Sequence, residues 1–247
     1  MAFDVAGHYD RFMGRFSAPL AHLTVERLAP APGTRVLDVG CGPGALTSEL
    51  VARLGAGAVA AVDPSPGFVA AAATRLPGVD VRQAGAQALP FADGEFDLVL
   101  AQLVVAFVPD PVAGLREMAR VGGRVAASFW DFGGQRSPLE LFWRAVRDLD
   151  PSHPGEAGWA GGTRGDLARM FRAAGLAPVV DDELTVSAAY SGFEEWWRTY
   201  ELGIGPVGDF VAALDAEQRE ALRHRCAELV PADGFEVEAT AWFVVSS

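Results

Sequence analysis

The sequence contains only two cysteines among its 247 residues, Cys41 and Cys226, and they lie far apart. Neither belongs to a CxxC pair or to a Cys/His spacing typical of a zinc site. We therefore expect no disulfide framework and no bound metal, and the chain suits a reducing compartment.

Basic side chains are also scarce. Lys and Arg together number 20 against 32 Asp and Glu, which gives a formal net charge of −12 and a pI near 4.7. No basic cluster interrupts this acidic composition, so the average surface would repel a phosphate backbone. We expect no nucleic-acid partner.

Long hydrophobic runs are missing as well. The longest, residues 98–108, is interrupted by Gln102 and is too short to cross a bilayer. The first residues lack the apolar stretch of a signal peptide. We expect a cytoplasmic protein without membrane association.

The sequence alternates strand-like and helix-like segments. Short β-rich runs predict strands, and the stretches between them, with apolar residues three or four positions apart, predict helices. This β-α-β order predicts an α/β fold: a Rossmann-like, seven-stranded, mostly parallel sheet with helices on both faces and an antiparallel last strand. The expected strands are 35–39, 58–62, 79–83, 97–101, 124–129, 177–186 and 235–245, and the expected helices include 45–54, 66–76, 111–120, 139–149 and 166–174.

The chain is 50% hydrophobic and long enough for one large core, so we expect residues 1–247 to form a single domain. Residues 1–33 are expected to form a helical cover and residues 34–129 the core of the fold. The remainder is rich in Gly, Pro and aromatic residues, which predicts helical lid insertions at 130–165 and 187–232. Two helices are expected in the second insertion.

The stretch TRVLDVGCGPGALTSEL, residues 34–50, places glycines between a strand and a helix. Glycines there allow a tight turn and a close backbone approach to a ligand, and the helix N-terminus offers free N–H groups. A βα turn without a ligand is the alternative. Asp63 ends the second strand about 20 residues later, where a carboxylate can bind ribose hydroxyls. Asp38 adds a negative charge beside the loop, which disfavours a pyrophosphate and favours a cationic ligand.

These motifs resemble those of class I S-adenosylmethionine-dependent methyltransferases, in the small-molecule, methyltransferase type 11-like branch. VLDVGCGPG resembles the first family motif, VDPS the acidic motif of the second strand, and ALPFADGEFDLVLAQLVVAFVPDPVAGLREMARVGGRV the middle of the branch. The similarity extends from Tyr9 to Phe129. It implies methyl transfer from S-adenosyl-L-methionine, with S-adenosyl-L-homocysteine as product. The aromatic residues of the insertions favour a small hydrophobic or aromatic acceptor, methylated at O, N or C, and the protein is expected to be a monomer or homodimer.

The resemblance also implies a set of cofactor contacts. The glycine loop would lie under the methionine portion, and Arg15 would pair with the α-carboxylate. The usual aspartate that reaches the adenine amino group is replaced by Gly85, which puts cofactor affinity in question. Gln102 is a polar group in an apolar run and needs a partner, either a ligand or a backbone carbonyl. The full expected set is Tyr9, Arg15, Asp38, Gly40, Cys41, Gly42, Gly44, Asp63, Pro64, Ser65, Ala86, Gln87, Gln102 and Leu103.

The reaction asks little of side chains, because the sulfonium leaving group is already activated and positioning carries most of the acceleration. If the acceptor needs a general base, the candidates are His8, Asp131 and His153. Trp130 and Trp159 are expected to line the acceptor pocket.

Two other interpretations are open. Gly40, Gly42 and Ala45 also satisfy a GxGxxA pattern, so a nicotinamide-dependent oxidoreductase is a less favoured alternative. The other is a methyltransferase-like protein that binds a ligand or regulates a partner without catalysis, because no base is evident.

Overall fold

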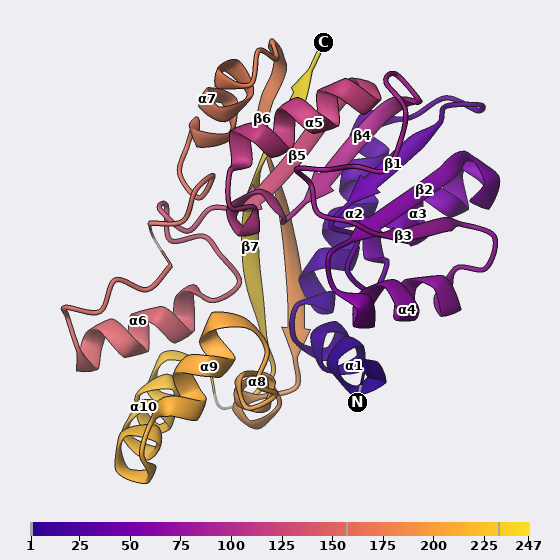
Figure 1. Ribbon diagram of the computed structural model, residues 1–247. Helices are drawn as coiled ribbons and strands as arrows, with labels where there is room; N and C mark the ends of the chain where they lie inside the picture. The colour runs from indigo at the N-terminus through magenta and orange to yellow at the C-terminus, as the bar shows by residue number, and fades with distance from the viewer. Residues whose placement is uncertain (1, 157, 232) are drawn as a thin grey trace.

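The computed structural model describes residues 2–156, 158–231 and 233–247, with side chains described from residue 7 onward. Its centre is a seven-stranded sheet of order β3-β2-β1-β4-β5-β7-β6 (Figure 1). The last strand, β7, runs antiparallel to both of its neighbours, β5 and β6, as expected from the sequence. The strands are β1 (Val36–Val39), β2 (Val59–Asp63), β3 (Asp80–Gln83), β4 (Phe96–Gln102), β5 (Gly122–Trp130), β6 (Pro178–Tyr190) and β7 (Phe235–Ser246).

The central strands are apolar because helices cover both faces of the sheet. Every residue of β1 and β2 is buried, whereas the edge strand β3 is mostly exposed. On one face, Leu100 and Gln102 of β4 meet α2 (Gly14–Leu28) and α3 (Ala45–Leu54). On the other face, Ala101 meets α5 (Pro111–Val121), beside which packs α7 (Asp166–Ala173). The predicted two-sided α/β fold is confirmed.

Local sequence signals explain where these helices begin. Ser65 caps α4 (Pro66–Arg75) by accepting a hydrogen bond from the amide of Phe68 at 3.5 Å, and proline occupies the first turn. The chain passes directly from α5 into β5 at Gly122, where a Cβ atom would lie 2.3 Å from Val99 Cγ2. The short 3-10 helices η1 (Ala56–Ala58) and η2 (Val105–Phe107) precede β2 and follow β4.

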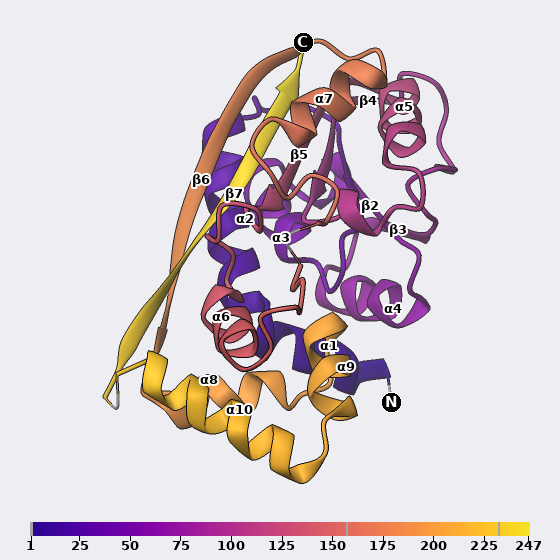
Figure 2. The same cartoon turned by 90° about the vertical axis from the view of Figure 1, so that its left-hand side faces the viewer.

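The remaining helices gather beyond the carboxyl edge of the parallel strands, where β6 and β7 extend past the sheet (Figure 1). We call α6 (Glu140–Leu149), α8 (Phe193–Tyr200), α9 (Gly205–Ala213) and α10 (Ala216–Leu229) the helical cap. Figure 2 shows α1 (Ala2–Phe12) between this cap and α4. The second insertion therefore holds three helices rather than the expected two, because α9 is short and apolar. Residues 1, 157 and 232, which fall in the predicted cover and insertions, lie outside the described residues.

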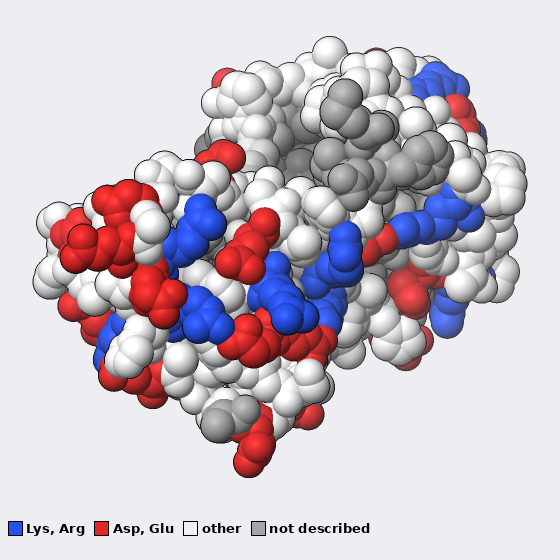
Figure 3. Space-filling view, turned by 90° about the horizontal axis from the view of Figure 1, so that it is seen from below, with Lys and Arg blue, Asp and Glu red and all other residues white. Residues whose placement is uncertain are grey.

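The outer face of the cap carries both signs of charge. Figure 3 shows arginine side chains lying among acidic ones rather than in a continuous basic stripe. Two pairs on this cap are Arg223 with Glu194 and Arg225 with Asp148, the latter at 2.7 Å. Within the described ranges, no helix is long and apolar enough to span a membrane.

Candidate functional site

The glycine loop between β1 and α3 adopts a conformation that only glycine tolerates easily. Gly40 and Gly44 have φ angles of 73° and 98°, in the left-handed region. A Cβ atom on Gly40 would lie 2.4 Å from Val104 Cγ2, and one on Gly44 would lie 2.9 Å from Leu76 Cδ1. Gly42, also left-handed at 54°, faces open space. The loop therefore brings bare backbone to the carboxyl end of β1.

A cavity lies between this loop, the end of β4 and the N-terminal helices, and we call it the glycine-loop cavity. The cavity volume open to water-sized molecules is only about 30 Å³. It sits between β1 and β4, where the strand order reverses and where open α/β sheets bind ligands. Of the predicted cofactor residues, those that line it are Tyr9, Asp38, Gly40, Cys41, Gly42, Gln102 and Leu103.

Asp38 contributes a carboxyl group to the wall of this cavity. Its side chain is 1% exposed, and it accepts a hydrogen bond from the Thr47 hydroxyl at 2.6 Å. Burial raises the pKa of Asp38 to about 7, against the opposing effect of Thr47, and the charge of Asp63 adds to the rise. A cation in the cavity would favour the ionised carboxylate, since opposite charges attract strongly where water is excluded.

The carboxylate of Asp63, which the sequence predicts to bind ribose, makes two hydrogen bonds within the protein. One carboxylate oxygen accepts a hydrogen bond from the Gly42 amide at 2.9 Å, and the other accepts one from the Ser65 amide at 2.8 Å. Burial raises the pKa of Asp63, and these two amide donors oppose the rise. A carboxylate has about four acceptor positions. Asp63 can therefore tether the loop and still accept ribose hydroxyls.

Tyr9 closes the cavity from α1. Its ring packs edge-on against Phe68 of α4, with 5.7 Å between centroids. The pKa of Tyr9 is raised to about 12, first by burial and then by the negative charges of Asp10 and Asp63. Burial likewise raises the pKa of the Cys41 thiol, so this group stays protonated and is a poor nucleophile.

Gln102 finds its hydrogen-bond partners within the protein. Its Nε2 donates to the carbonyl of Ser17 at 2.9 Å, and its Oε1 accepts from the Thr24 hydroxyl at 3.3 Å. Of the two partners expected from the sequence, the structure thus contains the backbone carbonyl. The next residue, Leu103, has a φ of 63°, which is rare outside glycine. This turn directs the chain from β4 into η2.

Arg15 does not line the glycine-loop cavity. Its guanidinium forms an ion pair with Glu195 of α8, donates to the Ala189 carbonyl at 3.0 Å and lies 4.7 Å from the Tyr190 ring centroid. To pair with a cofactor carboxylate, as expected from the sequence, the Arg15 guanidinium would first have to leave Glu195. A polar residue two positions later, Ser17, lines the cavity instead. Sequence reasoning missed it, although a serine on the buried face of α2 was a detectable signal.

The three candidate bases are placed apart from the glycine-loop cavity. Asp131 accepts hydrogen bonds from the Gly134 amide, the Trp242 indole and Arg136 at 2.8, 3.1 and 2.7 Å. His153 stacks on Trp143 in the cap. His8 lies on α1 and does not contribute to the cavity wall. Asp131 thus holds together the local structure around Gly134 and Trp242, and its role as a base stays a prediction.

The predicted adenine neighbours lie on the loops after β2 and β3. Pro64 is exposed, and its carbonyl accepts from Gln83 at 3.1 Å, while Ser65 is occupied as the cap of α4. Ala86 packs against Gly114 of α5, where a Cβ atom would lie 3.5 Å away, and Gln87 is exposed. None of them lines the glycine-loop cavity, so their adenine contacts stay predictions.

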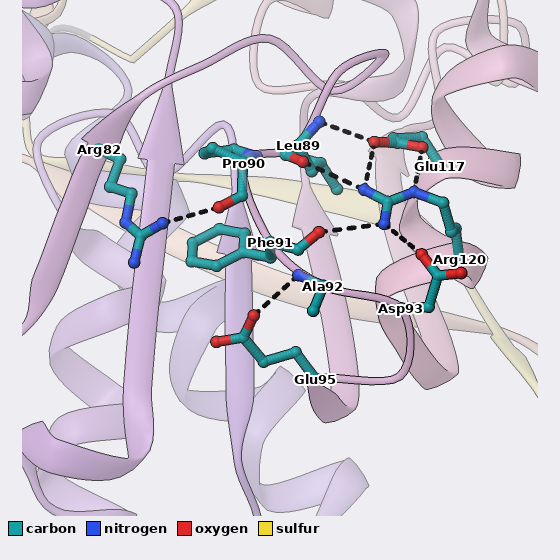
Figure 4. Close-up of polar contacts among 9 residues, drawn as sticks. All are labelled: Arg82, Leu89, Pro90, Phe91, Ala92, Asp93, Glu95, Glu117 and Arg120. Carbon is teal, nitrogen blue, oxygen red and sulfur yellow. Dashed lines mark hydrogen bonds and ion pairs between the residues drawn. The ribbon is translucent and has the colours of Figure 1, made fainter.

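An arginine on α5 holds the loop that follows these residues (Figure 4). Arg120 donates to the carbonyls of Leu89 and Phe91 at 3.1 and 3.0 Å and to the carboxylate of Asp93 at 2.6 Å. Glu117 pairs with Arg120 at 2.8 Å and accepts from the Leu89 amide at 2.9 Å. The loop of residues 88–95 is thereby fixed against α5.

The two tryptophans expected to line an acceptor pocket have different environments. Trp130 is 3% exposed and packs edge-on against Phe16 of α2, so it lies in the core of this structure, and its contact with an acceptor stays a prediction. Trp159 is half-buried and contacts Phe107, with 4.8 Å between centroids. Phe107, which sequence reasoning missed, is 61% exposed. We call the group of mutually contacting rings the aromatic cluster: Phe107, Phe129, Phe132 and Trp159.

Comparisons with known proteins agree with this architecture. A family model described as "Methyltransferase domain" matches residues 37–126. Trans-aconitate 2-methyltransferase of Methylobacterium nodulans is 32% identical over 223 residues, which cover 86% of this chain and 83% of that protein. Nocamycin O-methyltransferase of Saccharothrix syringae is 31% identical over 202 residues, 72% of each chain.

Two further comparisons concern fold and length. A solved structure of a SAM-dependent methyltransferase from Aquifex aeolicus has the same fold, with a TM-score of 0.52 at 20% identity over 66% of this chain and 83% of that chain. The chain spans about half, 54%, of the length of an uncharacterized Mycobacterium tuberculosis relative that is 34% identical over 155 residues, 60% of this chain. Together with the glycine loop, the two acids Asp38 and Asp63, and the strand order, these similarities show that the chain belongs to the family of S-adenosylmethionine-dependent methyltransferases.

Proposed function

We propose that this protein transfers a methyl group from S-adenosyl-L-methionine to an O, N or C atom of a small, hydrophobic or aromatic molecule. The observation that carries the proposal is the glycine-loop cavity, in which bare backbone at Gly40 and Gly42 adjoins the buried carboxyl of Asp38. A cationic ligand with a ribose suits this combination, because Asp38 favours positive charge and Asp63 retains acceptor positions.

The residues present fit this cofactor. The methionine portion would lie on Gly40, Cys41 and Gly42, with Asp38 nearest the ammonium group. Asp63 would bind the ribose, while Pro64, Ser65, Ala86 and Gln87 would border the adenine. When bound, the cofactor supplies an activated methyl group on sulfur. The protein positions it and excludes water, which accounts for most of the acceleration that an in-line transfer needs.

Cofactor entry requires α1 to move. Typical ligand pockets hold about 300 Å³ or more, whereas the space open to water-sized molecules here is about 30 Å³. Tyr9 closes the cavity through its contact with Phe68, and Asp10 forms an ion pair with Arg75 of α4. Breaking these contacts would open the site. The contacts of Tyr9 and Asp10 with α4 support the proposal that residues 1–33 act as a helical cover.

The acceptor would bind against the aromatic cluster, under the insertions at 130–165 and 187–232. Val104 touches the glycine loop at Gly40, and Phe107 follows three residues later with its ring largely exposed. Exposed aromatic faces suit an apolar or ring-containing acceptor. The names of two relatives, a trans-aconitate and a nocamycin methyltransferase, also refer to small-molecule acceptors.

A second candidate function is ligand binding without catalysis. It is favoured by one observation: none of the three candidate bases lies ready in the cavity. Asp131 accepts hydrogen bonds from Gly134 and Arg136, and neither His8 nor His153 lines the cavity. Transfer to an already nucleophilic atom needs no such base, so methyl transfer is the preferred function.

The deciding experiment has two steps. Calorimetric titration with S-adenosyl-L-homocysteine and, separately, NADH should give heat of binding only with the first. Incubation with methyl-labelled cofactor and a panel of phenols, carboxylic acids and amines should then transfer label to an apolar member. Binding without transfer across the panel would favour the non-catalytic function, and binding of NADH alone would favour an oxidoreductase.

A further inference from the structure

Ser17 carries a buried hydroxyl without a partner at the wall of the glycine-loop cavity. The residue is 3% exposed, and its Oγ forms no hydrogen bond with the part of the chain that the structure describes. The Tyr9 phenol lies beside it, close enough for a side-chain hydrogen bond with Ser17 to lower the pKa of Tyr9, but the two groups do not meet ordinary hydrogen-bond geometry. Buried hydroxyls in proteins are nearly always hydrogen-bonded. An unpartnered hydroxyl beside a cavity therefore indicates a missing ligand atom.

The backbone around Ser17 is held firmly. Its amide donates to the Met13 carbonyl at 2.8 Å, and its carbonyl accepts from Gln102 Nε2 at 2.9 Å. Gln102 is itself oriented by the Thr24 hydroxyl at 3.3 Å. These contacts fix the position of the Ser17 Cβ, so the hydroxyl is presented from a rigid support and only its rotation is free.

The charges around the cavity indicate what the hydroxyl binds. The amino-acid end of S-adenosyl-L-methionine carries an ammonium and a carboxylate. Asp38 provides an acceptor for the ammonium, but the carboxylate needs a donor. Arg15, the donor expected from the sequence, is engaged with Glu195 on α8. Ser17 lines the same cavity as Asp38 and has a hydrogen to donate.

We infer that the Ser17 hydroxyl donates a hydrogen bond to the α-carboxylate at the methionine end of the cofactor. The inference rests on the proposed function. It makes Ser17 a binding residue for the amino-acid end only, distinct from the contacts to ribose and adenine. A ligand that lacks this end should not respond to the loss of the hydroxyl.

The test compares two ligands by calorimetry. S-adenosyl-L-homocysteine has the amino-acid end, and 5′-deoxy-5′-methylthioadenosine lacks it. Ser17→Ala and the size-matched Ser17→Cys should weaken the first ligand by about 10- to 100-fold, as expected for a hydrogen bond to a charged group. Both variants should bind the second ligand like the wild type.

Ser128→Ala is the matched control, because Ser128 is 2% exposed, has an unpartnered hydroxyl and does not line the glycine-loop cavity. It should change neither affinity. Equal weakening of both ligands in the Ser17 variants, or unchanged affinity for both, would overturn the inference. If the wild type binds neither ligand, the proposed function itself fails. Thermal unfolding of each variant confirms that it is folded.

Discussion

The carboxylate of Asp63, at the end of β2, accepts a hydrogen bond of 2.9 Å from the amide of Gly42 in the loop after β1. The same carboxylate that is proposed to bind the ribose therefore also fixes the backbone on which the rest of the cofactor would lie. Loop geometry and ribose recognition depend on one side chain.

Replacing Asp63 tests this dual role. Asp63→Ala should weaken S-adenosyl-L-homocysteine binding by about 1–3 kcal/mol, because a charged acceptor and the loop tether are lost together. Calorimetry measures the affinity, and amide hydrogen exchange of residues 40–44 measures the loop. Asp148→Ala, which removes an acid of the helical cap that pairs with Arg225, is the control and should leave loop exchange unchanged. An unaltered affinity in Asp63→Ala would mean that the carboxylate has no ligand role.

The raised pKa of Asp38 predicts a pH-dependent affinity. In the free protein this pKa is about 7, so the carboxyl is mostly protonated below that value. A bound ammonium favours the ionised form and lowers the pKa in the complex. Affinity should therefore be highest above about pH 7 and fall by at most about tenfold per unit as the pH decreases below it.

The measurement is calorimetric titration with S-adenosyl-L-homocysteine between about pH 5.5 and 7.5. Asp38→Asn should bind more weakly and lose most of the slope, leaving only what Asp63 contributes. The stability of the ligand-free protein should change in the opposite sense. Its free energy of unfolding should decrease as the pH rises from the ordinary pKa of 3.8 to about 7, because in this range folded Asp38 keeps a proton that the unfolded chain has lost. A flat affinity profile in the wild type would contradict the assignment of Asp38.

Arg120 should control the order of the loop beside the predicted adenine site. Arg120→Ala removes donors to the Leu89 and Phe91 carbonyls, so amide exchange across residues 88–95 should become faster. Arg116→Ala is the matched control, since Arg116 lies on the same helix but donates to the Ala173 carbonyl next to α7. Equal exchange in both variants would show that the loop is held by other contacts.

Phe107 should affect the acceptor rather than stability. Its ring is 61% exposed, so Phe107→Ala should change the free energy of unfolding by less than about 1 kcal/mol. The KM for an apolar acceptor should rise several-fold, while the affinity for S-adenosyl-L-homocysteine stays the same. Leu149→Ala, which truncates a side chain 50% exposed on the cap, should leave all three quantities unchanged. A loss of cofactor affinity in Phe107→Ala would place the ring in the cofactor site instead.

The sheet and the glycine loop could be predicted from the sequence, because their signals are local. The alternation of apolar strands and amphipathic helices fixes the α/β order, and β1 begins and ends within one residue of its predicted bounds. The glycines at positions 40 and 44 indicate a left-handed backbone from the sequence alone, since only glycine adopts those φ angles at low cost. The two acids follow from their places at strand ends.

The partners of the polar side chains were decided only by the tertiary structure. Arg15 meets Glu195, 180 residues later, and Asp131 meets Trp242, 111 residues later. Gln102 and Ser17 are joined across 85 residues. A hydrogen bond depends on atomic positions within a few tenths of an ångström, and these positions arise from packing between distant elements. Sequence periodicity specifies which face of a helix or strand is buried, but not which side chain or backbone group of another element contacts that face.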